Sequence, residues 1–164
     1  MVLAAGAATR YGGPKQVELL PAVLAALGQA TGVDEVVVVE GAYELGGACD
    51  DSSQSCRVVR CAAWEQGPGA SLRCGVAALG PGVTHALVVL ADGPELDPRA
   101  VERLLAHRDE GPVLAASYAG SRSHPVLLAR TAWSRIPDEG GRALDATLID
   151  CSDLTAPGDV DFRR

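Results

Sequence analysis

The sequence predicts an α/β fold. Short apolar runs alternate with segments of helical character, which is typical of strands connected by helices. Four consecutive valines, residues 36–39, form a β-branched run that fits a strand buried on both faces, as in a parallel sheet. With 48% hydrophobic and 21% charged residues, the chain can form a packed core.

The individual elements follow from where glycine, proline and aspartate interrupt the apolar runs. Strands are predicted at residues 1–5, 36–39, 57–61, 86–91, 112–117 and 125–129. Helices are predicted at residues 16–30, at residues 70–79 and after Asp97-Pro98, where an aspartate cap precedes a proline in the first turn. Pro21 is expected to break or start the first helix. Residues 41–56 are interpreted as a surface connection, and the tail after Asp150 has no clear period.

Length and charge narrow the function classes. A chain of 164 residues without an internal repeat predicts one domain spanning residues 1–164. The net charge of −7 repels a phosphate backbone, which argues against nucleic-acid binding. The apolar runs are too short to cross a membrane, and the five-residue apolar start is too short for a secretory leader, so a cytoplasmic location is expected.

The five cysteines are odd in number and show no zinc-type spacing. This pattern predicts reduced thiols in a cytosolic protein, with a disulfide framework as the alternative. The cysteines are Cys49, Cys56, Cys61, Cys74 and Cys151.

The first candidate site is the segment LAAGAATRYGGPK, residues 3–15. Its small residues let a phosphate approach the backbone, where successive amide N–H groups can donate to it. Arg10 and Lys15 supply positive charge for a triphosphate. The spacing is neither that of a Walker loop nor that of a dinucleotide fingerprint. The alternative is an ordinary strand-to-helix turn with two solvated basic residues.

Three further residues are candidates at the ends of predicted elements. Asp92 follows an apolar strand, where α/β sheets bind ligands, and its carboxylate could hold Mg²⁺; the alternative is a turn former. Ser71 lies near a helix start and could contact a phosphate or base; the alternative is a capping serine. His124 could face an acceptor substrate; the alternative is a structural histidine.

Several segments, in order, resemble the MobA-like nucleoside triphosphate transferases. The similarity begins with LAAG, Arg10 and Gly12-Gly13-Pro14-Lys15. It continues through Trp64-Glu65-Gln66-Gly67 with Ser71-Leu72-Arg73 and Gly75, then LADGPEL at residues 90–96, His124-Pro125-Val126, Asp138 to Arg142, and Asp159-Val160-Asp161. The resemblance spans nearly the whole chain.

The resemblance implies a three-layer α/β/α fold with a mostly parallel, Rossmann-like sheet. It implies attack by an acceptor phosphate oxygen on the α-phosphorus of the triphosphate, with diphosphate leaving. The backbone of Leu3, Ala4, Ala5 and Gly6 would hold phosphates, and Arg10 and Lys15 would neutralise the diphosphate. Asp92 would hold Mg²⁺ together with a second acidic residue, for which Asp161 is favoured over Asp159.

Pro14-Lys15-Gln16 resembles the cytidylyltransferase branch of the family. The triphosphate would then be CTP, the acceptor molybdopterin carrying molybdenum, and a molybdoenzyme a further partner. Guanylyl transfer, another phosphorylated acceptor and a non-catalytic nucleotide- or cofactor-binding chaperone stay open as alternatives.

The chain departs from the family pattern at several points. Cys61 stands where the family usually has an asparagine or aspartate that contacts the nucleoside, and a thiol is a poor hydrogen-bond partner. Phe162 replaces the usual threonine after D-x-D.

Overall fold

The computed structural model describes residues 1–8, 11, 13–49 and 55–158. Its centre is one seven-stranded sheet in the order β3-β2-β1-β4-β6-β5-β7. β6 runs antiparallel to β4 and β5, and the other neighbouring pairs are parallel. The strands are β1 (Val2–Ala4), β2 (Val36–Glu40), β3 (Cys56–Arg60), β4 (His85–Leu90), β5 (Val113–Tyr118), β6 (Ser121–Ala129) and β7 (Thr147–Asp150). The predicted mostly parallel sheet is therefore confirmed.

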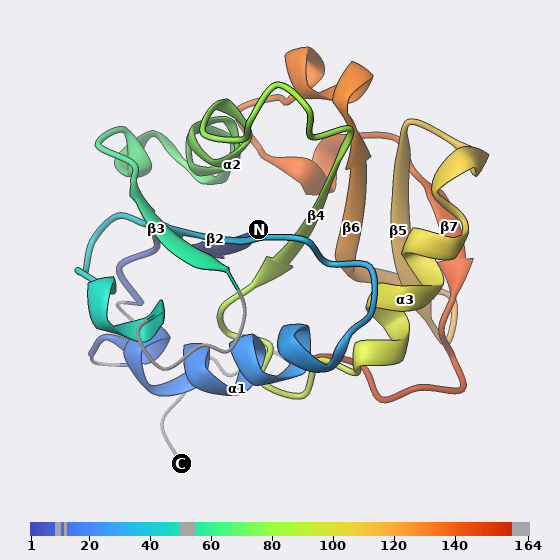
Figure 1. Ribbon diagram of the computed structural model, residues 1–164, viewed down its shortest axis with the longest axis horizontal. Helices are drawn as coiled ribbons and strands as arrows, with labels where there is room; N and C mark the ends of the chain where they lie inside the picture. The colour runs from blue at the N-terminus through green and yellow to red at the C-terminus, as the bar shows by residue number, and fades with distance from the viewer. Residues whose placement is uncertain (9–10, 12, 50–54, 159–164) are drawn as a thin grey trace.

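Helices cover both faces of this sheet. They are α1 (Lys15–Gln29), α2 (Pro68–Ala77) and α3 (Pro98–Ala106). In Figure 1, α2 lies above the sheet and α1 below it. Short 3-10 turns complete the chain: η1 (Gly46–Cys49), η2 (Trp64–Gln66), η3 (Arg108–Glu110), η4 (Arg130–Arg135) and η5 (Gly141–Ala143). The three-layer α/β/α prediction is confirmed.

Two apolar clusters form the core, one on each face of the sheet. In β4, Leu87 and Val89 belong to the cluster shared with α1 and α3, whereas Ala86 and Val88 belong to the cluster shared with α2. Successive strand residues point to opposite faces, so a fully apolar strand feeds both clusters. Burying each valine or leucine side chain contributes about 1.5–3 kcal/mol, which explains why uninterrupted apolar runs form the inner strands.

The structure corrects the prediction for Pro21. The proline lies inside α1 and does not break it. Because proline has no N–H, the backbone carbonyl of Val17 lacks its usual hydrogen-bond donor in the helix. Val17 and Pro21 are both exposed, so water can bond to that carbonyl instead. The helix starts at Lys15 and continues through Pro21 without a break.

Two chain segments differ from their predictions. The connection at 41–56 includes η1 and a buried Leu45, which is 4% exposed, and its last residue starts β3. The other difference is β7, which the sequence did not predict. β7 pairs parallel with β5, but Ile149 is its one buried position, so no apolar run announces it.

Four of the five cysteines form disulfides, which corrects the prediction of reduced thiols. Cys49 pairs with Cys56 and Cys61 with Cys74, at Cα–Cα distances of 5.3 Å and 5.7 Å, while Cys151 is free and buried. Both distances lie in the range that a disulfide needs. The fold creates this proximity, which sequence separations of 7 and 13 residues do not reveal.

Among the described residues, no helix combines the length and apolar character that a membrane span requires.

Candidate active site

The candidate site lies at the edge of the sheet where β1, β2 and β4 end. Hydrogen bonds to three consecutive backbone carbonyls fix the loop after β1. Ala42 N–H donates to Ala5 O at 3.0 Å, Gln16 Nε2 to Gly6 O at 2.7 Å, and Tyr43 Oη to Ala7 O at 2.9 Å. Within the described part of the chain, no acceptor is found for the backbone N–H groups of residues 6–8. Such a loop is suited to donating amides to an anion.

The positive φ of Ala8 turns this loop sharply toward α1. Its φ is 48°, in the left-handed region that L-residues rarely adopt. A non-glycine residue stays in that region only when its surroundings fix it, and the anchored carbonyls on its N-terminal side do so.

Lys15 and Asp92, both predicted as site residues, are brought together. Lys15 Nζ lies 3.0 Å from Asp92 Oδ2, and the two side chains are 9% and 26% exposed. Lys15 is the only lysine in the chain. Its position at a helix N-terminus is unfavourable for a cation because of the helix dipole, and the nearby carboxylate offsets this. The pair places one positive and one negative charge side by side at this edge of the sheet.

His124 lies against the same turn. A Cβ built on Gly93 would lie 2.6 Å from His124 Cε1 and Nε2, so only glycine allows this approach. Both ring nitrogens are buried, and neither has a hydrogen-bond partner among the described residues. Burial lowers the pKa of His124 to about 4, although the Asp92 charge raises it in part. His124 is therefore a neutral imidazole at pH 7, with two unused polar atoms beside Asp92.

A cavity of about 640 Å³ opens on the α2 face of the sheet next to His124. Aliphatic side chains of β1, β4, β6 and α2 form its floor: Leu3, Leu72, Val88, Leu90, Val126 and Leu128. Arg122, Arg142 and Glu139 supply its charges. The volume suits a small-molecule ligand with an apolar body and anionic groups.

Arg122 is a fixed part of the cavity wall. Its guanidinium donates to Leu144 O at 2.6 Å and to Gly141 O at 2.9 Å. Burial and the neighbouring Arg142 charge both lower the pKa of Arg122. Arg122 stays charged at neutral pH because an arginine pKa starts far above 7. The wall is thus positive, and it borders the site that holds Lys15.

The start of α2 packs on the loop after η4. Gly69 N–H donates to Asp138 O at 3.0 Å, and Arg73 bonds Ile136 O at 3.0 Å and Asp138 Oδ1 at 2.8 Å. Gly67 is the N-cap of α2, which rules out Ser71 as its capping residue. Ser71 is the fourth residue of the helix, 6% exposed, and does not line the cavity, although its neighbour Leu72 does. The motif segments at residues 64–75 and 138–142 are therefore adjacent in space despite their separation in sequence.

Some predicted residues are placed elsewhere or lie outside the described residues. Arg10, Asp159 and Asp161 are not among the described residues. Leu3 lines the cavity, whereas Ala4 and Ala5 are buried at 2% and 5% exposure. Cys61 is fully buried in its disulfide with Cys74, so its side chain does not offer a thiol to a nucleoside.

Sequence reasoning missed three residues that shape the site. Gln16 packs against the loop, and its buried Oε1 has no hydrogen-bond partner among the residues that the structure describes. Arg122 and Arg142 form the positive wall of the cavity. Arg142 lies inside a motif that was recognised, so its charge was a usable signal. Arg122 stands between two serines and looks like an ordinary surface residue.

Comparison with known proteins identifies relatives along nearly the whole chain. Nicotine blue oxidoreductase of Paenarthrobacter nicotinovorans is 31% identical over an aligned length of 185 residues, covering 98% of this chain and 90% of that protein. Rv0371c of Mycobacterium tuberculosis H37Rv superposes with a TM-score of 0.71 at 26% identity, covering 98% and 91% of the two chains. A nucleotidyl transferase of Methanothermobacter, Mth528, gives a TM-score of 0.63 at 26% identity, covering 82% and 72%.

The family comparison agrees with the motifs found in the sequence. The model of the MobA-like NTP transferase domain matches residues 1–148, which include the loop after β1, Lys15, Asp92 and His124. The chain therefore belongs to the MobA-like NTP transferase family.

Proposed function

We propose that the chain transfers a nucleoside monophosphate from CTP to a phosphorylated acceptor of the molybdopterin type and releases diphosphate. The observation that carries this proposal is the Lys15–Asp92 pair, 3.0 Å apart, between an amide-donating loop and a cavity with a positive wall. These parts match what phosphoryl chemistry needs, because the protein mainly positions the reactants and neutralises charge.

The triphosphate would lie on the loop after β1. The backbone amides of residues 6–8, which have no acceptor in the described part of the chain, would donate to phosphate oxygens. The Lys15 ammonium would turn from Asp92 towards the phosphates. Arg10 is proposed to add a second positive charge, and Ser71 a contact from α2. Neutralising the diphosphate makes it a better leaving group.

The acceptor would occupy the cavity on the α2 face. Its apolar floor can hold a planar ring system, and the Arg122 and Arg142 charges favour an anionic substituent. His124, neutral and unpartnered, is available to bond the acceptor. The acceptor's phosphate would thereby be held close to the α-phosphorus, which lowers the entropic part of the barrier.

Mg²⁺ is part of this proposal. Asp92 fits a magnesium ligand, because it is a partly exposed carboxylate beside the expected phosphates, and Mg²⁺ commonly uses one or two carboxylates with phosphate oxygens. The described residues contain no cluster of three or more acidic, histidine or cysteine side chains, so phosphate oxygens and Asp161 would complete the ligand set. The ion would supply charge neutralisation at the transferred phosphate.

One competing function follows from the relatives. The relative at 31% identity is an oxidoreductase, and the aliphatic floor of the cavity would also hold a flat dye-like substrate. A second alternative is a binding protein or chaperone that holds nucleotide or cofactor without turnover. A cytoplasmic location and a molybdoenzyme partner belong to the favoured proposal.

Two measurements separate these functions. Calorimetric titration with CTP, GTP, ATP and UTP in the presence of Mg²⁺ tests the nucleotide, and CTP is expected to bind most tightly. A clear preference for GTP would replace cytidylyl by guanylyl transfer. Diphosphate release with molybdopterin identifies the transferase, and a binding protein releases none. An oxidoreductase would instead change the oxidation state of nicotine blue when a redox partner is supplied.

A further inference from the structure

The segment that follows β7, residues 151–158, runs back to the candidate site, and we call it the C-terminal strap. Cys151, Leu154 and Pro157 are its buried residues. Its far end reaches the turn after β4, where Glu95 N–H donates to Pro157 O at 3.1 Å. A Cβ built on Gly93 would lie 3.1 Å from Pro157 Cβ. Gly93 is thus enclosed by His124 on one side and by the strap on the other.

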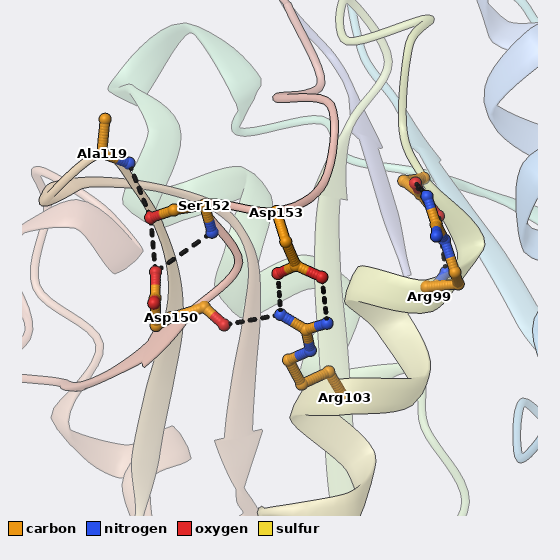
Figure 2. A network of polar contacts seen from close by, with 7 residues as sticks. Arg99, Arg103, Ala119, Asp150, Ser152 and Asp153 are labelled. Atoms are coloured by element: carbon orange, nitrogen blue, oxygen red, sulfur yellow. Dashed lines mark hydrogen bonds and ion pairs between the residues drawn. The ribbon is translucent and has the colours of Figure 1, made fainter.

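One arginine of α3 holds the strap near its start. Figure 2 shows Arg103 reaching both carboxylate oxygens of Asp153, at 2.5 Å and 2.9 Å, and Asp150 O at 2.8 Å. The fork-shaped guanidinium matches a carboxylate in this two-point contact, which an ammonium could not reproduce. The contact lowers the pKa of Asp153 to about 2 and raises the pKa of Arg103.

Asp150 and Ser152 fasten the same corner to the turn between β5 and β6. Ser152 Oγ donates to Asp150 Oδ1 at 2.5 Å and accepts from Ala119 N–H at 3.0 Å. Cys151 N–H also donates to Ser117 O at 2.8 Å. Arg103 therefore connects α3 to a corner that is already fixed on β5, and the strap leaves this corner in a defined direction.

We propose that Arg103 and Asp153 are positioning residues for the candidate site: their ion pair sets the path of the strap, and the strap fixes the turn that carries Asp92. The inference rests on the proposed transferase function. The route is short, because Asp153 lies four residues before Pro157, whose carbonyl holds Glu95 three residues after Asp92. Neither residue of the pair touches the cavity or the Lys15–Asp92 pair.

If the Arg103–Asp153 ion pair contributed only to stability, its loss should have only a small effect. Asp153 is 63% exposed and Arg103 30% exposed, and ion pairs of this kind contribute little to global stability. Loss of the pair should therefore leave the melting temperature nearly unchanged. Loss of alignment at a reacting centre, by contrast, costs up to about a hundredfold in rate for a displacement of about 1 Å.

The test uses the full chain with R103Q, D153N, the double variant and a matched control. Arg99 lies one turn earlier on α3 and pairs with Asp97, the N-cap of that helix, at 2.6 Å, so R99Q removes an ion pair whose hydrogen bonds do not involve the strap. Two readouts are taken: hydrogen–deuterium exchange of residues 91–97, which include the Glu95 amide, and kcat and KM for diphosphate release.

R103Q and D153N should each speed exchange at Glu95 and lower kcat by about tenfold or more. The double variant should be no worse than either single variant, because both remove the same contact. R99Q should match the wild type in both readouts. Unchanged exchange, or faster exchange with unchanged kcat, would overturn the inference. An inactive wild type that binds no nucleotide would instead contradict the proposed function.

Discussion

The two faces of the sheet are filled in different ways. On one face, α1 and α3 lie side by side over a continuous apolar cluster. On the other face, the ten-residue α2 and short 3-10 turns leave a cavity of about 640 Å³ over β1, β4 and β6. The same apolar strands supply both faces, so the number and length of the covering helices decide where a ligand can enter.

This difference assigns stability to one face and binding to the other. The α1/α3 face should behave as an ordinary core, where lost volume costs stability alone. The α2 face should tolerate changes in volume better but respond in ligand affinity. The charged pair Lys15–Asp92 lies at the edge where the two faces meet, since Lys15 starts α1 and Asp92 adjoins His124.

The largest effect is expected at this edge, for Asp92→Asn. Asparagine keeps the size but removes the charge that would hold Mg²⁺, and diphosphate release should fall by about 10²–10³-fold. Because the ion pair between Lys15 and Asp92 is then lost, the melting temperature should fall as well. Asp97→Asn is the control, because Asp97 caps α3 and asparagine caps as well. Full turnover in Asp92→Asn would make Asp92 a turn residue.

A pair of leucine truncations tests the contrast between the faces directly. Leu104→Ala, on the α1/α3 face, should cost about 2–5 kcal/mol in unfolding free energy and leave nucleotide and acceptor affinity unchanged. Leu90→Ala, on the cavity floor, should cost less, because Leu90 is only half-buried at the end of β4 and lines the cavity. Chemical denaturation and calorimetric titration measure both quantities. Equal losses of unfolding free energy, with unchanged ligand affinity in both variants, would show that the two faces of the sheet do not differ in this way.

Of the two disulfides, Cys61–Cys74 is the one at the α2 face, where it joins the end of β3 to α2. Replacing both residues by serine should cost about 3 kcal/mol, the value for a closed loop of this length. The Cys49–Cys56 pair closes a shorter loop away from the cavity and serves as the control. Thiol titration of the unfolded, unreduced chain should find one thiol, Cys151. Five thiols would restore the reduced-thiol prediction.

The fold could be predicted because its inner strands are continuous apolar runs, whatever their neighbours. β7 could not, because an edge strand with one buried residue leaves no such run. The disulfides depend on distances that only the folded chain creates. In each case the missing information was tertiary rather than local.

The candidate site divides in the same way. Asp92 was predictable because it follows the end of a strand, where α/β sheets bind ligands, and Lys15 because it closes the segment of small residues that starts in β1. Their direct contact was not predictable, and neither was the role of Arg122, which depends on two backbone carbonyls from η5 and the loop that follows it. The neutral state of His124 depends on burial against Gly93, which no motif encodes.

A moderate effect is expected for Lys15→Ala on triphosphate binding. A hydrogen bond to a charged group contributes about 1.5–3 kcal/mol, so the dissociation constant should rise by about ten- to a hundredfold. The loss should shrink at high salt, because screening weakens the wild-type contact. Reductive ¹³C-methylation offers a direct NMR probe, since Lys15 is the only lysine and the other amine is terminal. Arg108→Ala, an exposed residue after α3, is the control.

An unchanged dissociation constant for Lys15→Ala at low salt would contradict phosphate binding by this side chain. Lys15 would then serve only to neutralise Asp92, and this edge of the sheet would stabilise the fold without contributing to triphosphate affinity.

The smallest effect concerns pH and His124. Burial lowers its folded pKa from 6.5 to about 4, so between these values the unfolded chain binds the additional proton. Stability from this group is therefore full above pH 6.5 and falls as the pH drops towards 4. Between pH 7 and pH 5.5 the loss should be about 1 kcal/mol, since each pKa unit corresponds to 1.36 kcal/mol. Denaturation of wild type and His124→Gln at both pH values measures it. Parallel curves for the two proteins would show that His124 titrates normally and faces water, which would move it from the buried wall of the cavity to its open rim.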